Sequence, residues 1–372
     1  MTNRIRQLNA LGQAVWLDYI SRRLIDSGEL QELVELGLSG LTSNPTIFHK
    51  SITGSTDYDD EIRRLARSGR PAAEIYEELV VRDIRDAADI LRPVYNETHG
   101  RDGFVSIEVS PKLACDAART IAEARRLFQT IGRPNVMIKV PGTEAGLPAI
   151  TALVGEGINV NVTLIFAISM YERVMQAYLE GLHRYEGTGR PLGLVSSVAS
   201  FFVSRVDTLV DKILVHRMQH DEEHLQPLLG LAAVANAKLA YARFRAVFQT
   251  DAFEEFRVRG GRPQRPLWAS TSTKNLEYAD TKYIDPLIGM HTVTTVPPQT
   301  LDALRDHGVA AQTIERDLAN AQAVMDELAG IKVDIDWVTN ALLEEGVKLF
   351  ADSYDALLAD LDQKRLALTQ AA

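Results

Sequence analysis

The sequence has a single cysteine, Cys115, among its 372 residues. No disulfide can therefore form within the chain, which excludes a disulfide-stapled scaffold and fits a reducing compartment. A cysteine nucleophile is disfavoured, because no histidine lies near Cys115 in the sequence. Free cysteines mostly pack as small apolar side chains, and we interpret this one as structural or incidental.

Long apolar segments are also missing. No stretch approaches the ~20 apolar residues that a membrane-spanning helix needs. The first residues, MTNRIRQLNALGQAVWLDYI, contain neither the apolar core nor the cleavage site of a signal peptide. Positive charge is not in excess, since 40 Lys and Arg stand against 50 Asp and Glu, a net charge of -10. We therefore expect a cytoplasmic protein without nucleic-acid or membrane partners.

Short apolar runs alternate with amphipathic segments along most of the chain. We predict eight strands, at residues 14–19, 38–43, 103–109, 135–140, 158–165, 191–199, 265–271 and 291–296. Strand–helix alternation predicts parallel pairing, and eight repeats favour a closed (β/α)8 TIM barrel, an α/β fold. A doubly wound open sheet stays as the alternative, because alternation by itself does not show closure.

Two helical regions exceed a minimal barrel. Residues 206–264 contain at least two long helical patterns and lie between the sixth and seventh predicted strands. Residues 310–372 have the periodicity of a helical tail. We interpret both as additions to one barrel domain spanning 1–372, with the tail packed on the barrel, rather than as a second domain.

The predicted strands carry polar side chains on one of their two faces. Alternate residues of a strand point to the same side. The rule places apolar residues on one face of the fifth strand, namely Ile158, Val160, Val162 and Leu164. The polar set at or near the carboxyl ends of five strands is Asp18, Thr42, Asn44, Ser106, Glu108, Lys139, Asn159, Asn161 and Thr163. Any one of them could be a turn or cap residue, but together they indicate a polar site in the barrel mouth.

A lysine among carboxylates in such a mouth suggests Schiff-base chemistry. Burial lowers the pKa of a lysine amine, and the neutral amine can attack a carbonyl group. The resulting iminium withdraws electrons, so that a neighbouring carbon–carbon bond can break. The reaction also needs a general base for the substrate hydroxyl. Our hypothesis is that Lys139 is the nucleophile and that Asp18 and Glu108 are the available carboxylates.

Six segments resemble signatures of the transaldolase family, in the family's order and from about residue 13 to 308. They are GLTSNPTIF (40–48), VSIEVSP (105–111), MIKVPGTEAG (137–146), GINVNVTLIF (157–166), SVASFFVSRVD (197–207) and VPPQTL (296–301). MIKVPGT followed by NVNVTLIF is the most specific combination. The resemblance is to a longer bacterial-type form, since the short forms lack the helices of 206–264 and of the tail.

The resemblance implies a class I, lysine-dependent (β/α)8 barrel enzyme that needs no metal and no organic cofactor. Such enzymes belong to the non-oxidative pentose phosphate pathway. They move a dihydroxyacetone unit from sedoheptulose 7-phosphate or fructose 6-phosphate to an aldose phosphate, either glyceraldehyde 3-phosphate or erythrose 4-phosphate. Phosphorylated sugars are thus the expected partners, and both a monomer and a homodimer remain open.

The resemblance also assigns catalytic roles. Lys139 matches the family's Schiff-base lysine, and Asp18 matches the aspartate that acts as general acid and base on the substrate hydroxyl. Glu108 and Thr163 match the pair that holds a catalytic water for forming and hydrolysing the imine.

The other matched residues bind substrate. Asn44 and Asn161 match asparagines that bind the dihydroxyacetone hydroxyls. Ser200 and Arg205 match the phosphate-binding serine and arginine, and Phe202 matches an aromatic lining residue.

One stretch departs from the family pattern. The shorter transaldolases carry an arginine in ASFRN after the seventh strand, where this sequence has WASTSTKN (268–275). Lys274 is the only cation there, and Ser270 or Ser272 could add a hydroxyl. The lysine either replaces the guanidinium as a point charge, without its bidentate geometry, or is a solvated loop residue.

Two other functions stay open. A class I aldolase acting on fructose 6-phosphate would release free dihydroxyacetone instead of passing it on. A non-catalytic sugar-phosphate-binding barrel would be favoured if the lysine or the carboxylates were missing, but all are present. His216 and His220 have the i,i+4 spacing of metal ligands without an HExxH-type context, so we interpret them as surface residues and expect no metal.

Overall fold

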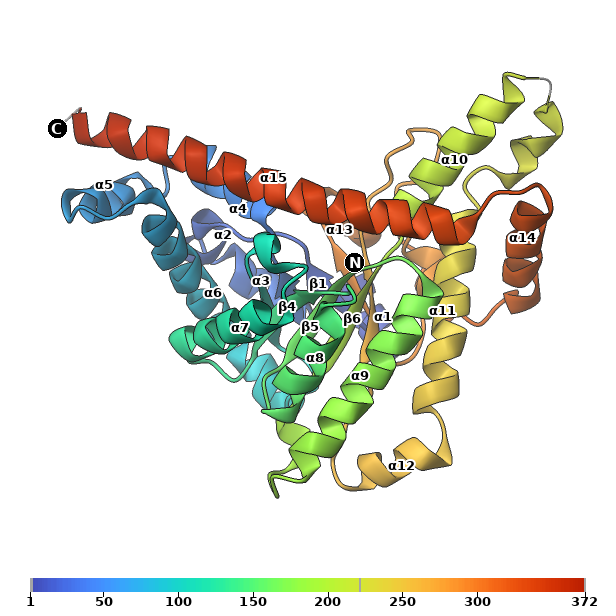
Figure 1. Ribbon diagram of the computed structural model, residues 1–372, viewed down its shortest axis with the longest axis horizontal. Coiled ribbons are helices and arrows are strands. Elements are labelled where there is room, and N and C mark those ends of the chain that lie inside the picture. Colours follow the sequence, from blue (N-terminus) through green and yellow to red (C-terminus); the bar gives the residue numbers. More distant parts are fainter. Residues whose placement is uncertain (1–2, 221, 371–372) are drawn as a thin grey trace.

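The computed structural model describes residues 3–220 and 222–370 of the chain. Eight parallel strands pair in chain order and close into a barrel (Figure 1). The strands are β1 (Gln13–Leu17), β2 (Gly40–Thr42), β3 (Phe104–Glu108), β4 (Val136–Pro141), β5 (Val160–Ile165), β6 (Ser197–Phe202), β7 (Arg265–Ala269) and β8 (Thr292–Val296). Pairing of β1 with β8, from Gln13 with Thr292 to Leu17 with Val296, closes the sheet. The predicted (β/α)8 barrel is confirmed, and the open doubly wound sheet is excluded.

The helices surround this barrel. They are α1 (Arg4–Ala10), α2 (Arg22–Asp26), α3 (Glu29–Glu35), α4 (Pro45–Thr53), α5 (Asp59–Arg67), α6 (Ala72–Glu97), α7 (Ala117–Ile131), α8 (Gly146–Gly155), α9 (Ile168–Glu186), α10 (Ser204–Met218), α11 (Ala232–Phe248), α12 (Asp251–Val258), α13 (Pro298–His307), α14 (Leu318–Gly330) and α15 (Ile335–Gln370). None of the helices in the described ranges is long and apolar enough to cross a membrane.

Two strand predictions needed correction. The sixth strand begins at Ser197, six residues after the predicted start, because Leu192–Leu194 forms a short 3-10 turn that follows Pro191. In β5 the pairing register with β6 shifts between Val162 and Ile165, and Leu164 has a φ of 60°. Such a bulge interrupts strict alternation. Leu164 therefore lines a small cavity beside Lys139, instead of sharing the outer face that alternation predicted.

The end of the barrel at the amino termini of the strands is closed by packed side chains. The ring of Trp16 lies against Gly40, where an added Cβ would come within 2.4 Å of the indole. Trp16 Nε1 donates a hydrogen bond of 2.8 Å to Asp102 Oδ1, and Arg265 Nη1 lies 3.0 Å from Asp102 Oδ2. The amino-terminal end of the barrel is thus filled by side chains, among them a buried ion pair.

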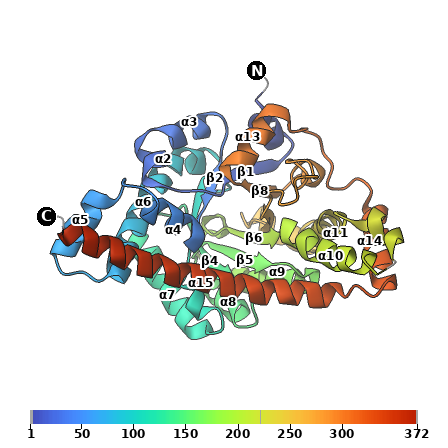
Figure 2. The same ribbon diagram turned by 90° about the horizontal axis from the view of Figure 1, so that it is seen from above.

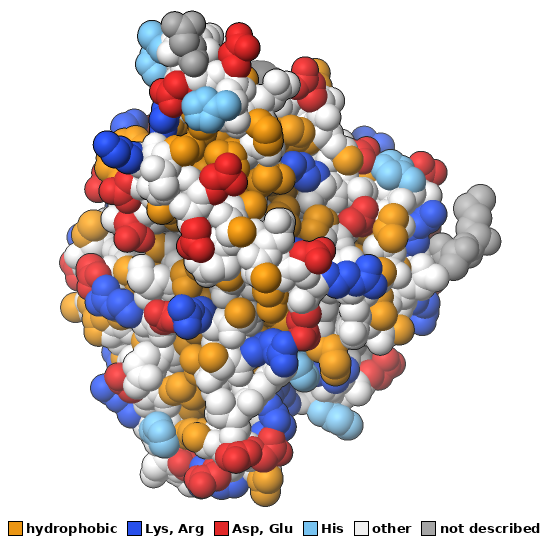
Figure 3. All heavy atoms as spheres, turned by 90° about the vertical axis from the view of Figure 1, so that its right-hand side faces the viewer, with side chains coloured by type: hydrophobic (Ala, Val, Ile, Leu, Met, Phe, Trp, Pro, Cys, Tyr) orange, Lys and Arg blue, Asp and Glu red, His pale blue; other side chains and the backbone are white. Residues whose placement is uncertain are grey.

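The predicted helical insertion contains α10, α11 and α12, between β6 and β7. Helix α11 contacts α9 and α14. Figure 3 shows the side of the molecule formed by α10, α11 and α14, where apolar side chains lie between charged side chains of both signs. In this view acidic side chains gather at the lower edge, and charges of both signs are mixed over the rest of the surface.

The predicted helical tail contains α14 and the 36-residue helix α15. Figure 2 shows α15 crossing the barrel, and it contacts α4, α5, α6 and α10 along its length. Its glycine, Gly346, lies over the end of β5, where an added Cβ would come within 2.9 Å of Leu164 Cδ2. The close approach lets α15 lie directly over the carboxyl ends of the strands.

Candidate active site

The centre of the site is Lys139 in β4. Its side chain is 5% exposed, and its Nζ lies 2.5 Å from Glu108 Oε1 in β3. The two residues are direct partners in the β3–β4 ladder, so their side chains point to the same side of the sheet. Lys139 Nζ also donates a hydrogen bond of 2.9 Å to the carbonyl of Ser43. The charge of this lysine is therefore paired at the carboxyl end of the barrel.

Two carboxyl groups flank the lysine. Burial raises the pKa of Glu108, and Lys139 opposes this shift. Burial also raises the pKa of Asp18, against the influence of Lys139 and of a 2.7 Å hydrogen bond donated by Thr42 Oγ1 to Asp18 Oδ1. Both groups thus keep a proton to higher pH than a solvated carboxyl group, which suits residues that give and take protons near neutral pH.

A chain of hydrogen bonds crosses the floor of the site. Ser200 Oγ donates to Asn161 Oδ1 at 2.7 Å, and Asn161 Nδ2 donates to Ser106 Oγ at 3.0 Å. The three side chains come from β6, β5 and β3, so all point into the barrel. Thr163 Oγ1 is buried and has no hydrogen-bond partner among the described residues. A buried hydroxyl of this kind is a ready binding group for water or substrate.

A pocket of about 400 Å³ opens above these residues. Of the ten predicted site residues, eight line it: Asp18, Asn44, Lys139, Thr163, Ser200, Phe202, Arg205 and Lys274. The other two lie directly behind, since Glu108 pairs with Lys139 and Asn161 bonds to Ser200. The volume is suited to a small metabolite rather than to a polymer.

Asn44 has two structural roles at once. Its Oδ1 caps the start of α4 by accepting a hydrogen bond of 3.0 Å from the backbone N–H of Ile47. Its side chain also lines the pocket. The turn chemistry that Asn44–Pro45 indicates and a place in the site are therefore compatible.

Three cations gather at the rim of the pocket. Arg205 begins α10 and lies over the ring of Phe202, with Cζ 5.6 Å from the ring centroid. Burial lowers the pKa of Arg205, and burial together with repulsion from Arg205 and Lys50 lowers the pKa of Lys274. Lys274 Nζ donates a hydrogen bond of 2.9 Å to Ser272 Oγ. An anion bound here would relieve the repulsion among the cations.

Lys50 and Phe350 are among the pocket-lining residues that sequence reasoning missed. Lys50 lines the same pocket from α4. It lies one helical turn after Thr46 and Ile47, on the same face of the helix, and this spacing could have predicted its place. Phe350 lines the pocket from α15. No signal in the sequence places Phe350 there, because only the docking of α15 across the barrel does so.

The other singled-out residues lie elsewhere. Cys115 is exposed, so of the two interpretations, structural or incidental, this position fits the incidental one. It precedes Asp116, the N-cap of α7, in a surface turn. The ring of His216, in the last turn of α10, meets the ring of His220, which follows α10, edge to face, with ring centroids 4.9 Å apart. In residues 3–220 and 222–370, no group of three or more His, Cys, Asp and Glu side chains is arranged to hold a metal ion.

A nucleophilic lysine needs shielding from bulk water, a partner to exchange protons with and room for a carbonyl compound. This barrel mouth supplies all three around Lys139. This combination of fold and site is the one expected of lysine-dependent (β/α)8 barrel enzymes.

Comparison with known proteins specifies the family. The sequence model of the Transaldolase/Fructose-6-phosphate aldolase family matches residues 15–361, and the chain belongs to this family. It is 48% identical over 360 residues to a transaldolase of Parafrankia sp. (strain EAN1pec), covering 96% of this chain and 97% of the relative. It is 43% identical over 377 residues to a transaldolase of Trichodesmium erythraeum (strain IMS101), covering 99% of both.

A third relative, a transaldolase of Thermobifida fusca (strain YX), is 46% identical over 371 residues, which is 99% of this chain and 100% of the relative. The alignments thus include the helices between β6 and β7 and the C-terminal helices. The predicted membership of the transaldolase family, in a longer form, is confirmed.

Proposed function

We propose that this chain transfers a dihydroxyacetone unit from sedoheptulose 7-phosphate or fructose 6-phosphate to glyceraldehyde 3-phosphate or erythrose 4-phosphate. This is a transaldolase reaction of the non-oxidative pentose phosphate pathway. The observation that carries the proposal is the buried contact of 2.5 Å between Lys139 Nζ and Glu108 Oε1 beneath a metabolite-sized pocket. The names of the near-full-length relatives support the same activity.

The proposed reaction begins with attack of Lys139 Nζ on the carbonyl carbon of the ketose phosphate. Glu108 exchanges protons with the amine and with the departing hydroxyl, so that water leaves and an iminium forms. Thr163, whose hydroxyl has no partner among the described residues, is proposed to hold that water together with Glu108. Asn44 and Asn161 are proposed to bind the hydroxyls of the dihydroxyacetone unit.

Bond cleavage follows when Asp18 removes the proton of the substrate hydroxyl. The carbon–carbon bond then breaks, its electron pair moves toward the iminium nitrogen, and an aldose phosphate leaves while an enamine remains on Lys139. The enamine carbon attacks the aldehyde of the acceptor, and Asp18 returns its proton to the new hydroxyl. Water then hydrolyses the iminium and frees the product ketose.

The rim cations are proposed to bind the phosphate group. Arg205 offers a planar fork of donors that matches phosphate oxygens, and Lys274 adds a point charge on the opposite loop. The hydroxyl of Ser200 already donates to Asn161, so we propose that Ser200 orients this asparagine. Phe202 is proposed to hold the arginine in place through its ring face.

Replacing Arg205 with alanine is expected to raise KM for phosphorylated sugars. A hydrogen bond to a charged group contributes about 1.5–3 kcal/mol, which corresponds to roughly a 10- to 100-fold change. Steady-state kinetics with fructose 6-phosphate and with fructose measure the effect. Equal losses for both sugars would contradict a role for Arg205 in binding phosphate.

A fructose 6-phosphate aldolase is the second candidate, because the matching family model covers both activities. The two reactions differ only in the fate of the enamine. We expect fructose 6-phosphate alone to release little free dihydroxyacetone, whereas fructose 6-phosphate with added erythrose 4-phosphate yields sedoheptulose 7-phosphate and glyceraldehyde 3-phosphate. Release of dihydroxyacetone at the same rate without any acceptor would favour the aldolase.

We further propose that the enzyme acts in the cytoplasm. The single, exposed Cys115 supports a reducing compartment. Fractionation of the producing cells, with activity measured in each fraction, tests this location.

A further inference from the structure

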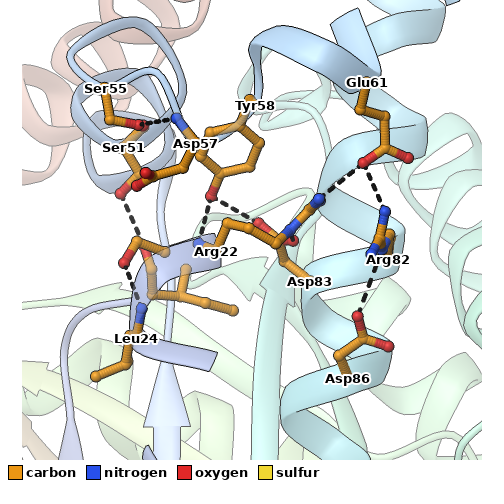
Figure 4. Close-up of polar contacts among 12 residues, drawn as sticks. Arg22, Leu24, Ser51, Ser55, Asp57, Tyr58, Glu61, Arg82, Asp83 and Asp86 are labelled. Atoms are coloured by element: carbon orange, nitrogen blue, oxygen red, sulfur yellow. Dashed lines mark hydrogen bonds and ion pairs between the residues drawn. The ribbon is translucent and has the colours of Figure 1, made fainter. Parts of the chain in front are cut away.

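A buried polar network lies outside the pocket, between helices α5 and α6 and the start of α2, which follows the loop after β1 (Figure 4). We call it the Arg22 network; its members are Arg22, Tyr58, Glu61 and Asp83. Arg22 Nε donates a hydrogen bond of 2.6 Å to Asp83 Oδ1, and Arg22 Nη1 donates one of 2.7 Å to Glu61 Oε2. The hydroxyl of Tyr58 donates to Asp83 Oδ2 at 2.7 Å and accepts the backbone N–H of Arg22 at 2.8 Å.

The Arg22 network is deeply buried. The side chain of Asp83 is fully inaccessible and that of Arg22 is 6% exposed. Buried ion pairs are costly to desolvate, and an apolar replacement of similar volume is often as stable. Stability alone is thus a weak explanation for charges here. None of the four residues lines the pocket or takes part in the proposed reaction.

The network is connected to the proposed general base by a short loop. Asp18 follows β1 directly, and only Tyr19, Ile20 and Ser21 separate it from Arg22. Within this loop, the carbonyl of Ile20 accepts a hydrogen bond of 2.8 Å from Ser51 Oγ of α4. Figure 4 shows Ser51 on α4, with a dashed line from its hydroxyl to the loop that leads to Arg22. Any shift of the Arg22 backbone is therefore transmitted to Asp18 over a few residues.

Lys139 is held differently. It lies inside β4 and contacts Glu108 of β3 and the carbonyl of Ser43. Among the described residues, no hydrogen bond or ion pair joins Lys139 to the Arg22 network. A disturbance of the network should therefore move Asp18 and leave the lysine in place.

We infer that the Arg22 network positions Asp18 for proton exchange with the substrate hydroxyl, by holding the loop after β1 against α5 and α6. Arg22, Tyr58 and Asp83 are positioning residues for carbon–carbon cleavage. Measuring two steps of the reaction distinguishes this positioning role from a general structural role. Imine formation needs Lys139, whereas carbon–carbon cleavage needs Asp18. The inference rests on the proposed function.

The test uses Asp83→Asn, which keeps the shape of the side chain and removes its charge. We expect kcat with fructose 6-phosphate and an acceptor to fall by about 10-fold or more, since a misplacement of about 1 Å can cost 10²-fold. The rate at which borohydride traps fructose 6-phosphate on the enzyme should stay within about twofold of the unaltered enzyme. Arg22→Lys, which keeps the charge but loses the fork of donors, should lose less activity than Arg22→Met.

A matched control is Asp102→Asn at the other end of the barrel. Asp102 forms a buried ion pair with Arg265, with side chains 10% and 9% exposed. Asp102→Asn should lower Tm, as the network variants should. It should change the rate of cleavage and the rate of borohydride trapping by the same factor. Tyr58→Phe removes only the hydroxyl that donates to Asp83; it gives a second measurement and is decisive if Asp83→Asn does not fold.

The inference is overturned if the network variants slow trapping and cleavage equally, as the control does, or if they slow neither. It is supported if only cleavage slows. Failure of the proposed function looks different, because the unaltered enzyme would then give no borohydride adduct on Lys139.

Discussion

Replacing Lys139 with methionine is expected to abolish turnover, lowering kcat by more than about 10⁴-fold. The amine is the only group in the site proposed to form a covalent bond with the ketose. Methionine keeps an unbranched side chain of similar length in the same buried space. Turnover is measured with fructose 6-phosphate and erythrose 4-phosphate, and borohydride trapping with mass spectrometry should map the adduct of the unaltered enzyme to Lys139.

The fold should survive this change. Lys139 lowers the pKa of both Glu108 and Asp18, so its removal lets each pKa rise further and each group take up a proton. The carboxyl groups are then buried as neutral acids rather than as unpaired charges. Circular dichroism and Tm verify the fold, and Lys212→Met on the surface of α10 is the control. An adduct on another lysine would refute the assignment.

Replacing Asp18 with asparagine is expected to lower kcat by about 10²- to 10⁴-fold, the usual contribution of a general acid–base group. The imine should still form, so borohydride should still trap fructose 6-phosphate on Lys139. Measuring trapping and turnover in the same preparation separates the two steps. Loss of trapping in Asp18→Asn would assign Asp18 to imine formation instead.

The pH profile gives a second test of Asp18. Burial raises the pKa of Asp18. As the pH falls, Asp18 is therefore protonated, and activity is lost, at a higher pH than for a solvated aspartate. Thr42 donates a hydrogen bond that favours the ionised form, so Thr42→Val should raise the pKa further and move the acid limb of the activity profile to higher pH. An unmoved limb would show that a group other than Asp18, such as Glu108, controls it.

Much of the site was predictable because strand periodicity is a local property. A period of two in β3, β4 and β5 places Glu108, Lys139 and Asn161 on the polar face, and a closed barrel turns that face inward. The prediction was wrong for Leu164, where a bulge in β5 breaks the period of two. A bulge cannot be read from alternation, because it depends on how β5 pairs with β6.

The sequence by itself determined the order of strands and helices, the polar face of each strand and the family. These follow from local patterns and from motifs that lie within short segments. Only the tertiary structure decided that Glu108 contacts Lys139, that Lys50 joins Arg205 and Lys274, and that Phe350 covers the pocket. The physical reason is that such contacts depend on strand register, on barrel closure and on the docking of α15, all of which join residues far apart in the chain.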